Sequence, residues 1–278
     1  MRKTFQIAHE APLSLMPFIR QVTDYDYALV HLFEDKELGG PYKNFFVESM
    51  KMGRKVILDN SIFELGEAFD VGKFFWHVQD LLPTEYIIPD VFQDSKGTLK
   101  NVEDWFQLVN EMNPAILTRC KAIGVVQGKT EEECIECYKA LASNPNIYKI
   151  AIPFDFEWYQ EQSRLSLKEV AYMVGRRHFV MKLSTIDKLL PIKPLHLLGC
   201  ALPQEFTYYK NVVPGLLYIE SIDTSNPVLH GMEGYRYTDE WLDFKSSTKM
   251  ATIMEEGATP QQVADVFYNI GKFRESII

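Results

Sequence analysis

The chain has 278 residues, a formal net charge of −9 at pH 7 and a hydrophobic fraction of 46%. This composition is that of an ordinary globular protein, with enough apolar residues for a sizeable core. The negative charge argues against a surface that coats nucleic acid broadly, because affinity for phosphates comes from clustered Lys and Arg. A local basic patch remains compatible with it.

The sequence contains no run of about 18 apolar residues, and its N-terminus is too polar for a signal peptide. We therefore expect a soluble, cytoplasmic protein without membrane contact. The cysteines are expected to be reduced thiols, because a chain of this length without a secretory signal rarely uses a disulfide framework. They are Cys120, Cys134, Cys137 and Cys200. Cys134 and Cys137 have CxxC spacing but lie within one predicted helix, so we interpret them as structural.

Short apolar runs rich in β-branched residues predict about eight strands along the chain. They cover residues 5–8, 28–33, 56–59, 86–89, 122–127, 148–153, 195–199 and 217–222. Helical periodicity between them predicts helices over 69–82, 102–112 and 131–141, and a closing helix from Pro260 to Phe273. The third helix opens with a capping-box pattern, Thr130 and Glu133.

Strands that alternate with helices predict an α/β fold, with a parallel sheet covered by helices. About eight such units favour a single-domain (β/α)8 TIM barrel over residues 1–278, and an open doubly wound sheet is the alternative. In "FQIAHEAPLS", which begins with the first predicted strand, no glycine-rich phosphate loop follows that strand, so a dinucleotide-binding fold is not favoured.

Three apolar strands end in an aspartate, and a fourth ends in a glutamine. The residues are Asp59 in "KVILDNSIFELG", Asp90 in "EYIIPDVFQD", Asp223 in "LLYIESIDTSNP" and Gln127 in "AIGVVQG". Any one aspartate could be a helix cap or a turn residue. Because the carboxyl ends of all barrel strands open on one face, we expect the four side chains to converge there.

In chain order, these motifs resemble the tRNA-guanine transglycosylase superfamily, which exchanges a guanine for a 7-deazaguanine base in nucleic acid. The similar segments are "ILDNSIFE", "IIPDVFQD", "GVVQGKT", "PLHLLGCALPQEF" and "IESIDTSNP". They span about Asp59 to Pro227. The resemblance implies a TIM barrel and pentosyl-transfer chemistry without a redox or nucleotide cofactor.

The chain departs from the superfamily pattern at three places. The zinc subdomain of the tRNA enzymes needs three cysteines and a histidine after the nucleophile, whereas no cysteine follows Cys200, so no zinc site is expected. "IPFDFEW" and Ser61-Ile62 stand where the family has glycine-rich segments. The short chain with "SIDTSNP" is most similar to the DNA 7-deazaguanine transglycosylases of phages and bacteria. This similarity implies DNA rather than tRNA as the acceptor, and the host cytoplasm as the compartment if a phage encodes the protein.

The resemblance also assigns roles. Asp223 would be the nucleophile that captures C1′, and Asp59 the acid that protonates the departing guanine. Asp90 would accept from the purine N–H groups, and the Gln127 amide would donate to O6. Phe63 would stack on the base, beside Asn60, while Leu198 and Gly199 would shape the pocket floor.

The target nucleotide must be flipped out of a duplex or be single-stranded, because C1′ is poorly reached in a stacked helix. The expected contacts to the nucleic-acid backbone are Arg176, Arg177, Lys182 and Arg236. His196 and His230 are interpreted as structural, since a lone histidine usually is.

Three alternatives stay open from the sequence. The acceptor could be tRNA, the barrel could be a glycosidase that uses Asp59 and Asp223 as its acid pair, or the chain could be a non-catalytic partner subunit. The presence of Asp223 argues against the last alternative. A homodimer is compatible with the sequence.

Overall fold

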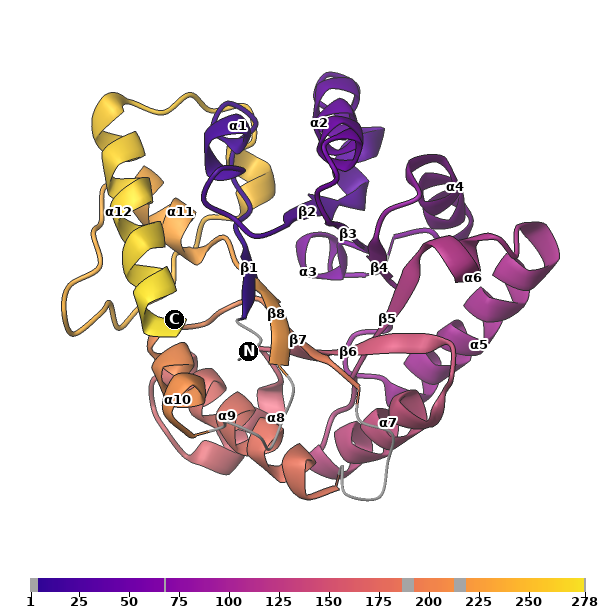
Figure 1. The fold of residues 1–278 in the computed structure, drawn as a ribbon. Helices are drawn as coiled ribbons and strands as arrows, with labels where there is room; N and C mark the ends of the chain where they lie inside the picture. Colours follow the sequence, from indigo (N-terminus) through magenta and orange to yellow (C-terminus); the bar gives the residue numbers. More distant parts are fainter. Residues whose placement is uncertain (1–4, 68, 187–192, 213–218, 278) are drawn as a thin grey trace. The chain divides into compact units, whose positions relative to one another are not determined.

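The computed structural model describes residues 5–67, 69–186, 193–212 and 219–277. In this part of the chain eight strands alternate with helices, and the strands pair in parallel (Figure 1). The chain therefore has the α/β, (β/α)8 barrel fold predicted from the sequence.

Residues 217 and 218 of the eighth predicted strand lie outside the described part of the chain. Eight strands lie at the predicted positions, with shifts of a few residues at their ends. They are β1 (Gln6–Ala8), β2 (Asp26–Leu29), β3 (Val56–Asp59), β4 (Glu85–Ile87), β5 (Lys121–Val125), β6 (Ile147–Pro153), β7 (Leu195–Leu198) and β8 (Ile219–Asp223). The second prediction, 28–33, was wrong in its latter part, because Val30–Glu34 forms the 3-10 helix η1. Both structures bury the same apolar run, so periodicity alone does not separate them.

Contacts divide the chain into two compact units, each described by itself. The β2–β6 unit comprises residues 25–152 and 187–194, and the β1/β7/β8 unit comprises 1–24, 153–186 and 195–278. Within the second, Ala8 pairs with Asp223 and His196 pairs with Ser221. The single-domain organisation expected from the sequence stays a prediction.

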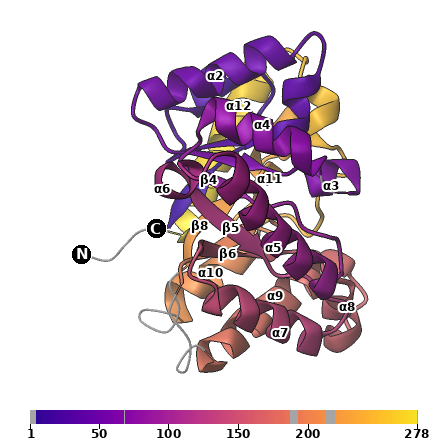
Figure 2. The same cartoon turned by 90° about the vertical axis from the view of Figure 1, so that its right-hand side faces the viewer.

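Amphipathic helices cover the strands of the β2–β6 unit: α2 (Gly39–Lys51), α3 (Ile62–Leu65), α4 (Val71–Leu81), α5 (Ser95–Met112), α6 (Ile116–Arg119) and α7 (Glu131–Ser143). Side-chain caps fix where three of these helices begin: Asp70 caps α4, Asp94 caps α5 and Thr130 caps α7. α5 begins earlier than predicted because Asp94 supplies its cap. Helices α5 and α7 lie side by side (Figure 2).

The β1/β7/β8 unit contains α1 (Met16–Ile19), α8 (Glu157–Ser163), α9 (Lys168–Ile186), α10 (Gln204–Val212), α11 (Asn226–Met232), η3 (Met250–Ile253) and α12 (Pro260–Ile277). The predicted closing helix is confirmed as α12, which packs against α11 and α10. Gly231 allows the close approach of α11, since a Cβ there would lie 2.5 Å from the Val266 backbone. Across the described part of the chain, no helix is both long and apolar enough to cross a membrane.

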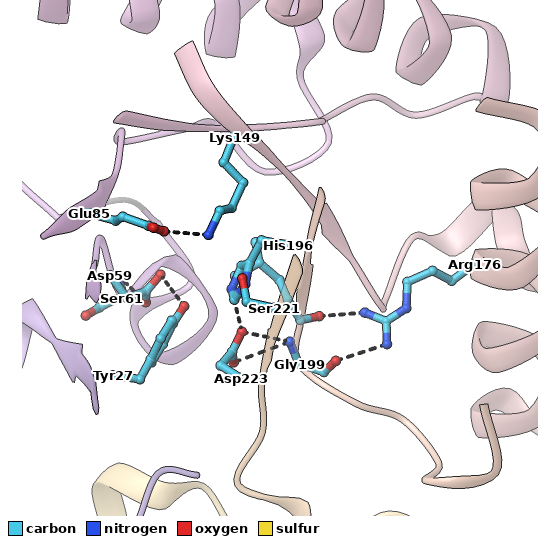
Figure 3. Close-up of polar contacts among 11 residues, drawn as sticks. Tyr27, Asp59, Ser61, Glu85, Lys149, Arg176, His196, Gly199, Ser221 and Asp223 are labelled. Carbon is cyan, nitrogen blue, oxygen red and sulfur yellow. Dashed lines mark hydrogen bonds and ion pairs between the residues drawn. The ribbon is translucent and has the colours of Figure 1, made fainter. Parts of the chain in front are cut away.

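A charged triad lies inside the β2–β6 unit. Lys149 Nζ lies 2.6 Å from Glu85 Oε2 (Figure 3). Lys55 Nζ lies 2.9 Å from Oε1 of the same carboxylate. Burial and the neighbouring ammonium of Lys149 lower the pKa of Lys55 to about 8. Although burial opposes its ionisation, the two ammonium groups hold the pKa of Glu85 below its usual value. The strands of this unit are thus joined by buried charges as well as by apolar packing.

Replacing Lys149 by Met should lower the free energy of unfolding by about 3–5 kcal/mol, because a buried carboxylate loses one of its two counter-ions. Urea denaturation measures this. The double variant Lys149→Met/Glu85→Gln should lose less than the sum of its single variants, since no charge is stranded. Lys129→Met, at an exposed position, is the matched control. A wild-type midpoint for Lys149→Met would show that the triad does not stabilise the fold.

Candidate active site

An amide and carboxylate cluster lies at the carboxyl ends of β3, β4 and β5. Asn60 Nδ2 donates to Asp90 Oδ1 at 2.7 Å, and Gln127 Nε2 donates to Asp90 Oδ2 at 2.6 Å. Gln127 Oε1 accepts from the backbone N–H of Gln93 at 2.9 Å. Because a backbone N–H only donates, this contact fixes which end of the Gln127 amide faces Asp90. The structure thus brings three of the predicted base-binding residues into direct contact.

The cluster is buried, and Asp90 is only 1% exposed. Both oxygens of Asp90 accept an amide N–H, so the position and plane of the carboxylate are fixed. Asn60 also donates to the Ile88 carbonyl at 3.0 Å, which ties the end of β3 to the segment after β4. Such a fixed acceptor suits recognition of N–H groups on a planar ligand.

Asp59, at the end of β3, is held by two donors. Tyr27 Oη donates to Oδ1 at 3.0 Å, and the Ser61 backbone N–H donates to Oδ2 at 2.8 Å (Figure 3). Tyr27 comes from β2, where it pairs with Ile57. Sequence reasoning missed Tyr27, because its contact depends on the register between two strands.

Ser61 has a left-handed backbone, with φ 62°. This conformation costs a non-glycine residue about 1–2 kcal/mol. Ser61 stands where the resembling family has a glycine, and it keeps a backbone that glycine adopts freely. The strained turn aims its N–H at Asp59 and starts the short helix α3. Phe63, on α3, is 50% exposed, and its role in stacking on a base stays a prediction.

Asp223, at the end of β8, is buried beside the turn that follows β7. The backbone N–H of Gly199 lies 3.3 Å from each of its carboxylate oxygens. His196 Nε2 lies 3.0 Å from Oδ1, and His196 Nδ1 lies 2.9 Å from Ser221 Oγ (Figure 3). His196 was interpreted as structural from the sequence, yet it contacts the predicted nucleophile. The parallel register of β7 and β8 creates this contact.

Arg176 was predicted to contact the nucleic-acid backbone, and this prediction was wrong. Its side chain is 0% exposed and forms a two-pronged pair with Glu205, with both N···O distances 2.8 Å. Burial disfavours the charged guanidinium, but the attraction of Glu205 outweighs it and raises the pKa of Arg176. The other guanidinium contacts are to the carbonyls of Leu198 at 2.8 Å and Gly199 at 3.0 Å. Arg176 therefore fixes the turn that faces Asp223.

The other three predicted backbone contacts keep surface positions. Arg177 is half-buried, with its guanidinium 3.7 Å from the Tyr208 ring centroid, and Lys182 is exposed on the same helix, α9. Arg236 is exposed, forms an ion pair with Asp265 and lies over the Tyr268 ring. Their role toward nucleic acid stays a prediction.

The two CxxC thiols are buried in α7, as expected. Cys134 Sγ lies 3.6 Å from the Gly128 carbonyl and Cys137 Sγ lies 3.9 Å from that of Val125. Burial raises the pKa of Cys137 to about 12, which disfavours the thiolate that a metal needs. Among the described residues, no group of three or more His, Cys, Asp or Glu is arranged to hold a metal ion.

The predicted site residues thus fall into two groups. Asp59, Asn60, Asp90 and Gln127 belong to the β2–β6 unit, and Leu198, Gly199 and Asp223 belong to the β1/β7/β8 unit. Every member stands at the carboxyl end of a strand or within three residues after it. The convergence of Asp59 with Asp223, expected from barrel geometry, stays a prediction.

Gly199→Ala tests the turn beside Asp223. Gly199 has φ 64°, and an added Cβ would lie 2.6 Å from Cδ1 of Phe154. We expect a loss of about 1–3 kcal/mol in the free energy of unfolding, from strain and overpacking. Gly271→Ala on α12 is the matched control, because nothing lies within 4 Å of its added Cβ and the substitution should be neutral or stabilising. Equal thermal unfolding of the two variants would contradict the described turn.

The chain was also compared with known proteins. No protein-family model matches it, and the search of curated proteins finds no match.

Proposed function

We propose that the protein is a guanine transglycosylase, which exchanges a guanine in nucleic acid for a 7-deazaguanine base. The observation that carries the proposal is the buried Asn60–Asp90–Gln127 cluster, a fixed acceptor flanked by amides at the carboxyl ends of neighbouring strands. A glycosidase with an acid pair does not need such a cluster, whereas recognition of a purine edge does. DNA is the proposed acceptor, on the resemblance of "SIDTSNP" and the short chain.

The proposed chemistry has two steps: formation of a glycosyl ester on Asp223 and its displacement by the incoming base. An oxygen of Asp223 donates an electron pair to C1′, and the electrons of the C1′–N9 bond leave with guanine, which takes a proton from the carboxylic acid of Asp59. The incoming 7-deazaguanine then loses its N9 proton to Asp59, and its nitrogen bonds to C1′. The electrons of the C1′–O bond return to Asp223, which leaves as a carboxylate.

The surroundings of the two aspartates support these roles. Asp223 receives a backbone N–H and lies at contact distance from an imidazole, so a carboxylate leaving group has donors ready for its charge. Asp59 receives the Tyr27 hydroxyl and the Ser61 N–H, one on each oxygen, which fixes its orientation for proton transfer. The Asp90 cluster would hold the purine while Asp59 exchanges its proton.

Asp223→Asn should reduce base exchange by several orders of magnitude, because an amide forms no glycosyl ester and offers no negative charge to an oxocarbenium centre. Incubation with DNA and a base analogue, followed by denaturation, should leave an adduct on the wild-type peptide that contains Asp223. Mass spectrometry detects it. Asp243→Asn, at an exposed position, is the matched control. An adduct that persists in Asp223→Asn, or one that maps to Asp59, would refute the assignment.

Asp90→Asn should weaken both the fold and guanine binding, because the NH2 group of its amide would face an N–H group of Asn60 or of Gln127. The double variant Asp90→Asn/Gln127→Glu restores a donor facing an acceptor inside the cluster but moves the carboxylate. We expect it to recover unfolding stability, measured with urea, while guanine affinity, measured by calorimetry, stays at least about 10-fold weaker. Wild-type guanine affinity in the double variant would remove Asp90 from base recognition.

A further inference from the structure

The candidate nucleophile lies at one end of a short polar chain buried within the β1/β7/β8 unit. The His196 ring lies between the other two side chains. Its Nδ1 is 2.9 Å from Ser221 Oγ, and its Nε2 is 3.0 Å from Asp223 Oδ1. The side chains of His196 and Ser221 are 0% exposed, so water does not compete for these contacts. His196 comes from β7, while Ser221 and Asp223 come from the same face of β8, two residues apart.

The direction of the protons follows from the acceptor at the end of the chain. A carboxylate only accepts, so a neutral imidazole at this position carries its proton on Nε2, on the side of Asp223. Nδ1 is then an acceptor, and the Ser221 hydroxyl donates to it. The Nε2–H points off the line to Oδ1, so the contact is bent. Catalytic hydrogen bonds often tighten only when substrate is bound.

We propose that His196 is a positioning residue, with its tautomer fixed by Ser221, that holds Oδ1 of Asp223 and stabilises this carboxylate when it leaves C1′. The inference rests on the proposed function. The same contacts identify the attacking oxygen. Oδ1 lies near both His196 Nε2 and the Gly199 N–H, whereas Oδ2, among the described residues, has the 3.3 Å contact from the Gly199 N–H alone. Oδ2 is therefore the oxygen that forms and later releases the bond to C1′.

This role affects the two steps unequally. A hydrogen bond to an ionised acceptor is roughly twice as strong as one to a neutral acceptor. The Nε2–H therefore stabilises the free carboxylate more than the glycosyl ester, in which Oδ1 is a neutral carbonyl oxygen. Without the N–H, the ester is favoured relative to the carboxylate, and departure of Asp223 is slowed. A residue that only fills space would not change this balance.

The test compares His196→Leu with His196→Gln, which keeps an N–H donor. We expect exchange of labelled guanine to fall by about 10- to 100-fold in His196→Leu, while the steady-state fraction of enzyme trapped as the Asp223 adduct equals or exceeds that of wild type. His196→Gln should recover part of the exchange rate. Ser221→Ala should lose a smaller factor, about 3- to 10-fold, because the ring remains but its tautomer is no longer fixed. His77→Gln is the control. His77 lies on α4 and pairs with Glu34, and this variant should exchange guanine at the wild-type rate.

The proposal would be overturned if the trapped Asp223 adduct and the rate of guanine exchange both fell in His196→Leu and the rate did not recover in His196→Gln. A second readout does not need turnover: ¹⁵N NMR of the imidazole should show Nε2 protonated and Nδ1 bare, with the His196 signal assigned by its loss in His196→Gln. A proton on Nδ1 alone would also overturn the proposal. If wild type formed no adduct with any nucleic acid, the proposed function would fail, and the tautomer would still report on the chain of contacts.

Discussion

The buried pair between Arg176 and Glu205 is the interaction on which the Asp223 side of the site depends. One guanidinium joins α9 to α10 through the carboxylate and holds the two carbonyls that end β7. Those carbonyls set the turn at Gly199, whose N–H faces Asp223. Since a buried ion pair seldom adds much stability beyond an apolar replacement, its value here is specificity of geometry. The buried guanidinium of Arg176 thus determines where the backbone N–H of Gly199 points.

The Asp59 and Asp90 side of the site depends on amides rather than on ion pairs. Asp90 accepts from two side-chain amides, and Asp59 accepts from a hydroxyl and a backbone N–H. The buried ammonium of Lys149 pairs with Glu85 instead, as does Lys55. Hydrogen-bond donors of this kind fix the direction in which each carboxylate points.

The sequence predicted the strands, the fold class and the strand-end aspartates, because apolar runs and their endings are local signals. It missed Tyr27 and His196, whose contacts with Asp59 and Asp223 exist only through the register of neighbouring strands. It misplaced Arg176, although a local signal was present: Tyr172 and Leu183 lie one and two turns away on the same buried face of α9. The partner Glu205, 29 residues further along, has no such signal.

Incorporation of labelled guanine into nucleic acid is the most direct measurement of base exchange. The protein is incubated with radiolabelled guanine and, separately, with DNA and with tRNA, and the label in each recovered nucleic acid is counted. If the protein is a DNA guanine transglycosylase, label enters DNA. An excess of a 7-deazaguanine base then displaces the labelled guanine without breaking the strand. Label found in tRNA alone would contradict DNA as the acceptor. Absence of label from both, with a folded protein, would contradict base exchange itself.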